Sequence, residues 1–330
     1  MSFSETYSTS NPGSAVSNRE DLLDVLTILA PEETPILSMA NKKKATAVQT
    51  EWTVDKYRTP STAGVAEGAD VTTYTDAFKE RARLSNYQQK FRSDYMVSDI
   101  QEAVDSVGPA DIAQAETKSI QELKRDIEAT LCSDNDRAVE NGAGTVYKLR
   151  GLGDWLDSTG PADVPSNYRT PADSLHLTGA FTETVLNTMI TSCFRVTGST
   201  NNLTLVADTA LRRKISDFAR LDPDGDAADT SIRNVNYSGK DAEIKLSVEV
   251  YKSHHGNVAV VNMNPDCAPD TVNTDTGFLL NPTYYGVAEL IPVGTRRLED
   301  QGGGPRGFVD CMLTLTMNHP QAHGMITAVA

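Results

Sequence analysis

The sequence predicts an α+β protein organised around one long helix, with extended strands before and after it. Residues 111 to about 140 carry apolar side chains at helical spacing, opposite a charged face. Residues 46–55 and 82–97 alternate between apolar and polar side chains, as strands do. Residues 287–298 and 308–317 indicate two more long strands around a glycine-rich loop. We therefore expect a helical spine on which the strands lie.

Composition limits the class of protein. The chain has 330 residues, 39% of them hydrophobic, and a net charge of −15. No apolar run approaches the roughly 18 residues of a membrane span, and the first residues lack the pattern of a signal peptide. The acidic charge argues against a protein whose main task is to grip phosphate backbones. Four scattered cysteines without a Cys-x-x-Cys pair predict free, packed thiols.

The N-terminal section reads as an arm followed by an anchor. Residues 1–17 predict an extended arm, and residues 18–29 predict a short helix capped by Asn18. An apolar anchor at 36–39 follows two prolines. The three lysines at 42–44 predict a solvated turn, with contact to nucleic acid as the alternative.

The strands at 46–55 and 82–97 predict a protruding hairpin whose tip, residues 58–78, is rich in small residues and contains Gly64 and Gly68. A two-stranded ribbon is marginal alone, so it should lie on another surface. The aromatic side chains could serve that contact or pack on their own domain. The candidate contact residues are Trp52, Tyr87, Phe91, Tyr95, Gly64 and Gly68.

After the spine, a loop-rich crossing spans residues 151–171, and an α/β section begins near residue 178. The expected elements are a helix at 181–194, a strand at 203–206, a helix capped by Asp208, strands at 244–251 and 258–261, and a final strand at 324–329.

No catalytic or metal-binding pattern is evident. Residues 222–226 lack the spacing of a calcium loop and favour a polar turn. The histidines show no sign of converging on a metal, so we expect no cofactor and no enzyme activity. The alternative from another class is a cytosolic α/β hydrolase or metal enzyme that uses His254 and His319.

Several strings, taken in order, resemble the major capsid proteins of tailed bacteriophages, which have the Hong Kong 97-type fold. The most specific is the spine string ELKRDIEATL at 122–131. The others are NREDLLDV at 18–25 with TPIL at 34–37, AEGAD at 66–70, RLSNYQQ at 83–89, and LTLTMNHPQAHG at 313–324.

The resemblance implies a structural protein that self-assembles into hexamers and pentamers of an icosahedral head enclosing double-stranded DNA. It implies an N-terminal arm with a short helix (1–45), an extended E-loop hairpin (46–98) and a P-domain with the spine helix and crossing (99–171). It further implies an A-domain (172–282) and returning P-domain strands (283–330). In this family the arm and E-loop lie over neighbouring subunits.

The resemblance also implies partners. The chain lacks an N-terminal scaffolding domain and a visible cleavage signal, so we expect a separate scaffold protein, together with a portal and a cement or decoration protein. Its acidity suggests that DNA is held by confinement, and no membrane is involved. The expected place is the virion, assembled in the host cytoplasm. An encapsulin-type compartment of the same fold is the close alternative.

Overall fold

The computed structural model describes residues 34–103, 111–157, 160–199, 202–218, 235–238, 241–244, 249–267, 276–299 and 301–327. The arm expected at 1–17, the helix at 18–29 and the polar turn at 222–226 lie outside these residues.

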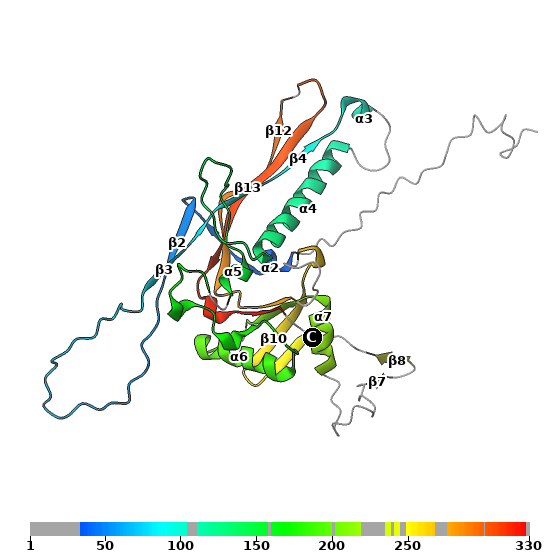
Figure 1. Ribbon diagram of the computed structural model, residues 1–330. Coiled ribbons are helices and arrows are strands. Elements are labelled where there is room, and N and C mark those ends of the chain that lie inside the picture. Colours follow the sequence, from blue (N-terminus) through cyan, green and yellow to red (C-terminus); the bar gives the residue numbers. More distant parts are fainter. Residues whose placement is uncertain are drawn as a thin grey trace, which may run out of the picture.

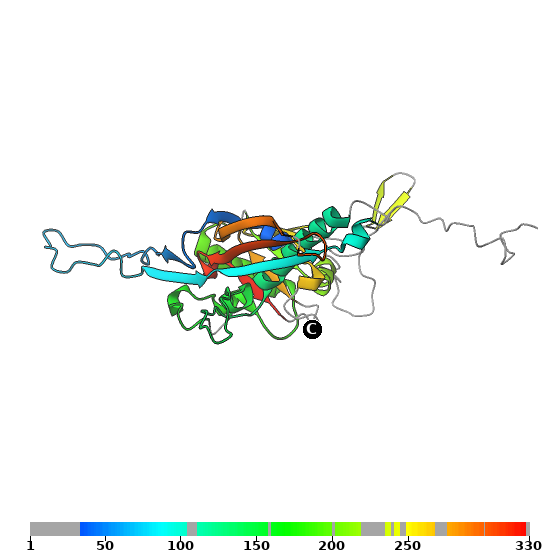
Figure 2. The ribbon, with the colours of Figure 1, turned by 90° about the horizontal axis from the view of Figure 1, so that it is seen from above.

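The spine helix α4 (Asp111–Cys132) lies along a four-stranded sheet, as Figures 1 and 2 show. The strand order is β1 (Asn41–Lys44), β12 (Tyr285–Leu298), β13 (Arg306–Met317) and β4 (Gln89–Met96). β12 and β13 are the long strands that the sequence predicts on either side of the glycine-rich loop, and they pair antiparallel.

One apolar core joins the helix to the sheet. Leu123, Ile127 and Leu131 are at most 1% exposed and belong to the same cluster as Phe91 and Val309. Their spacing of four residues puts them on one face of the helix. The predicted apolar stripe is therefore confirmed, and burial of this stripe is the main stabilising contribution to the helix.

The spine ends eight residues earlier than the predicted end near residue 140. The Ser133 hydroxyl donates to the Thr130 carbonyl oxygen (2.7 Å), and the polar run that follows favours turns over helix. Gly151 and Gly153 then pack against this end. A Cβ on Gly151 would lie 2.0 Å from the Ser133 carbonyl oxygen, so the loop approaches this closely only with glycine.

The expected turn at residues 42–44 is wrong. These lysines lie in β1, which pairs parallel with β12 from Asn41 opposite Gly286 to Lys44 opposite Glu289. The residues of β1 are exposed, as expected of a solvated segment. The lysine run hides the strand because its pairing partner lies more than 240 residues away in the sequence. Nearby, α2 (Pro35–Met39) is the predicted apolar anchor, with Ile36 fully buried.

The predicted hairpin is present. β2 (Gln49–Val54) pairs antiparallel with β3 (Ala82–Tyr87), and β3 runs on into β4 after Gln88. The first half of this extended stretch, β3, therefore belongs to the hairpin, and the second half, β4, belongs to the central sheet. The helix α3 (Asp99–Ala103) follows.

The α/β section is a six-stranded sheet with order β5, β14, β11, β6, β10 and β9, accompanied by two helices. Its faces belong to different cores: Leu205 and Leu279 pack with the helices, whereas Val206 and Phe278 pack with the spine cluster. Its elements are β5 (Leu175–His176), α6 (Glu183–Thr197), β6 (Thr204–Ala207), α7 (Thr209–Phe218), β9 (Val250–Ser253), β10 (Gly256–Asn262), β11 (Gly277–Leu280) and β14 (Gly324–Ile326).

Two local predictions of the α/β section concern Asp208 and the strand at 244–251. Asp208 directly precedes α7, and its carbonyl oxygen accepts from the Arg212 amide (2.9 Å), as that of an N-cap residue does. The Asp208 side chain accepts from the adjacent Thr209 amide (2.5 Å). Of the strand expected at 244–251, Ile244 ends β8 (Asp241–Ile244), which pairs with β7 (Val235–Ser238), and residues 250 and 251 begin β9, whereas residues 245–248 lie outside the described ranges. The crossing holds α5 (Leu152–Trp155) and 3-10 turns at Ser166–Tyr168 and Ala172–Ser174; further such turns are at Pro265–Cys267 and Pro320–Ala322.

All four cysteines are free and buried, as predicted. Among the described helices, none is long and apolar enough to cross a membrane.

Candidate subunit-contact hairpin

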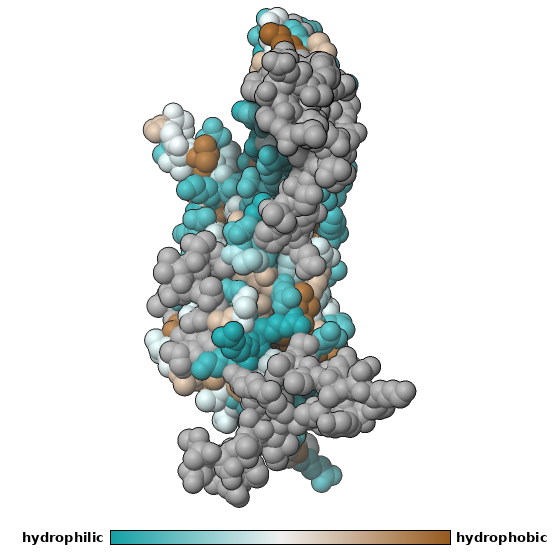
Figure 3. Space-filling model, turned by 90° about the vertical axis from the view of Figure 1, so that its right-hand side faces the viewer, coloured by the Kyte–Doolittle hydropathy of each residue, from teal (hydrophilic) through white to brown (hydrophobic). Residues whose placement is uncertain are grey.

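A loop of residues 55–81 joins β2 to β3 and projects far from the rest of the protein, at the lower left of Figure 1. Apolar side chains are exposed along its whole length, where nothing in the described chain covers them. They are Tyr57, Val65, Val71, Tyr74 and Phe78, with exposed fractions from 61% to 103%. By contrast, the described part of the face in Figure 3 is mainly hydrophilic. Exposed apolar side chains gathered on one projection mark an interaction site.

The candidate aromatic residues lie outside this loop, on β2, β3 and β4, and they pack against other parts of the same chain. Phe91 and Tyr95 are each 7% exposed and face the spine helix from β4. The Trp52 ring centroid lies 5.9 Å from that of Trp155, and the indole N–H donates to the Met317 carbonyl oxygen (3.0 Å). Phe91, Tyr95 and Trp52 therefore pack within their own subunit, which was the alternative to a contact between subunits.

Tyr87 is the last residue of β3, at the root of the hairpin, and its side chain is partly buried. Its ring centroid lies 6.1 Å from that of Tyr147, and the Arg137 guanidinium lies 5.5 Å from its centroid. The two glycine candidates differ from the aromatic ones, because Gly64 and Gly68 lie in the exposed loop. No atom lies within 4 Å of a Cβ built on either, and Gly68 has a φ of +76°, which glycine adopts without strain.

Five exposed apolar residues of the loop were not among the predicted contact residues: Tyr57, Val65, Val71, Tyr74 and Phe78. A signal was available, since these apolar side chains sit in a polar stretch with no strand or helix period that would bury them. The large aromatic side chains of the strands were favoured because no nearby sequence offered them a core. The spine cluster supplies that core for Phe91 and Tyr95.

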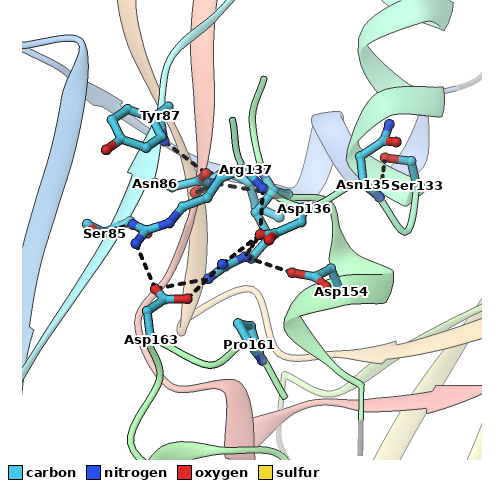
Figure 4. A network of polar contacts seen from close by, with 12 residues as sticks. Ser85, Asn86, Tyr87, Ser133, Asn135, Asp136, Arg137, Asp154, Pro161 and Asp163 are labelled. Atoms are coloured by element: carbon cyan, nitrogen blue, oxygen red, sulfur yellow. Dashed lines mark hydrogen bonds and ion pairs between the residues drawn. The ribbon is translucent and has the colours of Figure 1, made fainter. Parts of the chain in front are cut away.

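A buried arginine fixes the root of the hairpin. The Arg150 side chain is only 2% exposed and contacts three carboxylates: Asp136 (2.7 Å), Asp154 (2.7 Å) and Asp163 (2.8 Å). Figure 4 shows these carboxylates converging from the segment after α4 (Asp136), from α5 (Asp154) and from the loop after α5 (Asp163). Arg137 makes a second ion pair with Asp163 at 3.1 Å. A buried guanidinium is tolerated only with such partners.

The electrostatics of this cluster follow from burial and pairing. Burial would lower the pKa of Arg150, but hydrogen bonds to Asp163 and Asp136 outweigh it, so the net shift is upward. Burial acts to raise the pKa of Asp163, and Arg150 reverses this, which leaves that pKa below its usual value. The pKa of Asp154 is raised, chiefly by burial. Both shifts of the Arg150–Asp163 pair favour its ionised form.

The cluster is tied to the hairpin through Asn86 of β3. The fully buried Asn86 accepts from the amides of Arg150 and Tyr87 (2.9 Å each) and donates to the Leu315 carbonyl oxygen (2.9 Å). The Arg137 guanidinium also donates to the Ser85 carbonyl oxygen (3.1 Å). One side chain therefore connects β3, β13 and the crossing, which holds the hairpin at a set angle.

A second anchor lies on the other side of the root. Lys56 donates to the Asn167 carbonyl oxygen and to the Gln321 side chain, and its ammonium lies 4.6 Å from the Tyr168 ring centroid. The Tyr168 hydroxyl donates to the Glu80 carbonyl oxygen. Burial lowers the pKa of Lys56. Both ends of the loop are thus attached to the body beside a hollow of about 410 Å³ that also reaches His319.

The histidines do not form a catalytic or metal-binding group. His319 packs between Tyr168 and Tyr284, at ring-centroid distances of 6.3 and 5.7 Å, and His254 is exposed in the turn between β9 and β10. Within the described ranges, no group of three or more His, Cys, Asp or Glu side chains could hold a metal ion.

Comparison with known proteins gives one family and a set of similar folds. The family model described as SU10 major capsid protein matches residues 4–330. The search of curated proteins found no match.

Among solved structures, the capsid of cyanophage A-1(L) is similar with a TM-score of 0.67 and 14% identity, covering 95% of this chain and 98% of that one. The capsid of the native GTA particle has a TM-score of 0.64 and 12% identity, covering 98% and 100%. The chain from Mycobacterium phage Bobi has a TM-score of 0.61 and 9% identity, covering 97% and 98%. These likenesses confirm the Hong Kong 97-type fold.

Proposed function

The chain belongs to the SU10 major capsid protein family, and on that premise we propose that its projecting hairpin joins neighbouring copies into the hexamers and pentamers of an icosahedral phage head. The structural capsid role follows from the family. The observation that carries the proposed contact is the loop of residues 55–81, which exposes five large apolar side chains away from the body that anchors it.

The length of the loop and its two held ends favour a contact between copies. A loop of this length that holds no regular structure is usually functional or a linker. Here both of its ends are held to the body, by Lys56 bonded to the Asn167 carbonyl and by the Glu80 carbonyl, which accepts from the Tyr168 hydroxyl. Anchored ends reduce the freedom that the loop loses when it lies on a partner. Covering its tyrosines and valines would remove apolar area from water, which is the main stabilising contribution at interfaces.

The position of the loop on one side of the molecule favours rings. In this proposal each copy gives a hairpin to one neighbour and receives one from another. Contacts between two different surfaces close into rings when the rotation permits, and otherwise propagate. Six-fold and five-fold rings of one chain are the closed forms that an icosahedral shell needs.

The domain division follows the same proposal. The limits are an N-terminal arm with a short helix (1–45), the E-loop hairpin (46–98), the P-domain spine and crossing (99–171), the A-domain (172–282) and the returning P-domain strands (283–330). The spine core supports the grouping of 99–171 with 283–330, because α4 packs on β13.

The partners proposed are a separate scaffold protein, a portal and a cement or decoration protein, with assembly in the host cytoplasm and no enzymatic role for the chain. The net charge of −15 supports a wall that confines DNA and attracts it weakly. A strongly basic inner face in the assembled shell would contradict this.

Negative-stain microscopy with light scattering tests the proposal directly. We expect the protein, expressed with its scaffold, to form closed shells or sheets of six-membered rings. A small oligomer of fixed size that never assembles in the presence of scaffold would refute it.

A further inference from the structure

We propose that Asn141 is a self-modifying site, at which the backbone amide of Gly142 attacks the Asn141 side chain and converts it to aspartate and isoaspartate. The site lies in residues 138–148, which follow the spine helix and which we call the Asn141 turn. The only other reactant is water, so the substrate is this chain itself. The inference goes beyond the proposed function, because the chemistry takes place within one subunit and does not depend on assembly.

The sequence supplies a reactive pair of residues. Asn141 precedes Gly142, and no other asparagine of the 330 residues precedes a glycine. Glycine leaves the attacking nitrogen unobstructed, because it carries no Cβ beside that nitrogen. Both residues are exposed, and apart from the chain neighbours no described atom lies within 4 Å of a Cβ built on Gly142. Water and base therefore reach the reacting atoms.

The turn holds the side-chain carbonyl that would be attacked. The Asn141 Oδ1 atom accepts two backbone amides, from Ala143 (2.9 Å) and from Thr145 (3.2 Å). When the Gly142 nitrogen adds to Cγ, this oxygen becomes negatively charged in a tetrahedral intermediate. Donors that already point at such an oxygen stabilise the charge as it forms, as an oxyanion hole does. The two amides therefore favour the addition.

The attacking amide has no competing hydrogen bond. In the part of the chain that the structure describes, the amides of Asn141, Ala143 and Thr145 donate within the turn, whereas the Gly142 amide donates to no acceptor. An amide that is free of an acceptor loses no hydrogen bond when it adds to a carbonyl carbon. The nucleophile is thus available in the folded state.

The base of the turn is fixed to itself. Ala138 and Lys148 exchange two backbone hydrogen bonds of 3.1 Å each, and the Asn141 amide donates to the Thr145 carbonyl oxygen (3.4 Å). Reacting groups that are held together in one turn have already lost much of the freedom that ring closure requires. The folded chain therefore bears part of the entropic cost of the reaction before it begins.

The atoms of the reaction balance without an oxidant or a reductant. A solvent base takes the proton of the Gly142 amide, and its nitrogen forms a bond to Cγ of Asn141. The Cγ–Nδ2 bond then breaks, and the departing nitrogen takes a solvent proton and leaves as ammonia. Water opens the resulting cyclic imide at either carbonyl, which gives aspartate or isoaspartate with an added negative charge. Because base begins the reaction, its rate should rise with pH.

Mass-spectrometric peptide mapping tests the site in the purified protein, incubated at neutral and at alkaline pH. Deamidation is followed by the gain in mass, and isoaspartate by enzymatic methylation. Gly142→Ala obstructs the attacking nitrogen. The matched control is Gly144→Ala, which changes a glycine of the same turn that also has positive φ and no atom within 4 Å of its Cβ. Asn257, which is exposed but precedes a valine, is the internal reference.

We expect Asn141 to deamidate about tenfold or more faster than Asn257, and Gly142→Ala to slow it by a similar factor, because exact placement of the reacting atoms is lost. Gly144→Ala should react as the wild type does. An intact Asn141 at alkaline pH, or equal rates at Asn141 and Asn257, would overturn the proposal. A much higher rate in urea-unfolded protein would also overturn it, because the turn would then protect the side chain.

Discussion

Replacement of Phe91 by alanine distinguishes packing within the subunit from contact between subunits. Phe91 is 7% exposed beneath the spine helix, in one cluster with Leu123 and Ile127. Removing a buried phenylalanine side chain costs about 3–5 kcal/mol, because apolar burial is lost and a cavity remains. We therefore expect the purified, unassembled subunit to unfold about 1–2 M earlier in urea, given a slope of about 3 kcal/mol/M.

The matched variant is Tyr74→Ala in the loop. Tyr74 is 86% exposed, so its loss should change the free energy of unfolding by no more than about 0.5 kcal/mol. Its effect should fall on assembly instead. Urea unfolding followed by circular dichroism, with shell yield measured in parallel, separates the two. An unchanged urea midpoint for Phe91→Ala would refute the placement of that ring beneath the spine.

Three further predictions concern the root and the spine. Arg150→Met should destabilise the subunit by about 1.5–3 kcal/mol, because the partly exposed carboxylates Asp136, Asp154 and Asp163 lose their hydrogen bonds to the buried guanidinium; calorimetry at pH 7 measures this, and a change below about 0.5 kcal/mol would contradict it. Trp52→Phe should cost about 1 kcal/mol, since the Met317 carbonyl loses its donor, and equal urea midpoints would count against that hydrogen bond. The third prediction is a pH dependence. Both Glu128 oxygens accept backbone amides of α2, yet burial raises the pKa of this carboxyl above 4.5. The wild type should therefore lose stability relative to Glu128→Gln as pH rises from 4.5 through the folded-state pKa, and parallel stability curves would refute the shift.

Periodic patterns made most of the elements predictable. The spine stripe and the alternating residues 82–97 each bury one face, and burial of one face imposes a period on the sequence. The order of family strings then identified the fold, which no single element could do.

What could not be predicted depends on partners far apart in the chain. The lysines of β1 resemble a turn in the sequence because their pairing partner, β12, lies far along the chain. The neighbours of Phe91 in the sequence do not form a core around it, because the spine helix provides that core in the folded chain. The early end of α4 depends on Gly151 and Gly153 packing against it. The Arg150 cluster joins turns that carry no shared motif, so charge content alone could not reveal it.

The most direct test of the central claim is to shorten the loop while keeping its root. Residues 59–77 would be replaced by a short Gly-Ser linker, which leaves β2, β3, Lys56 and Arg150 in place. The account predicts a folded subunit with a wild-type urea midpoint that forms no shells with scaffold present. Closed shells from the shortened protein, seen by microscopy at the wild-type yield, would contradict it.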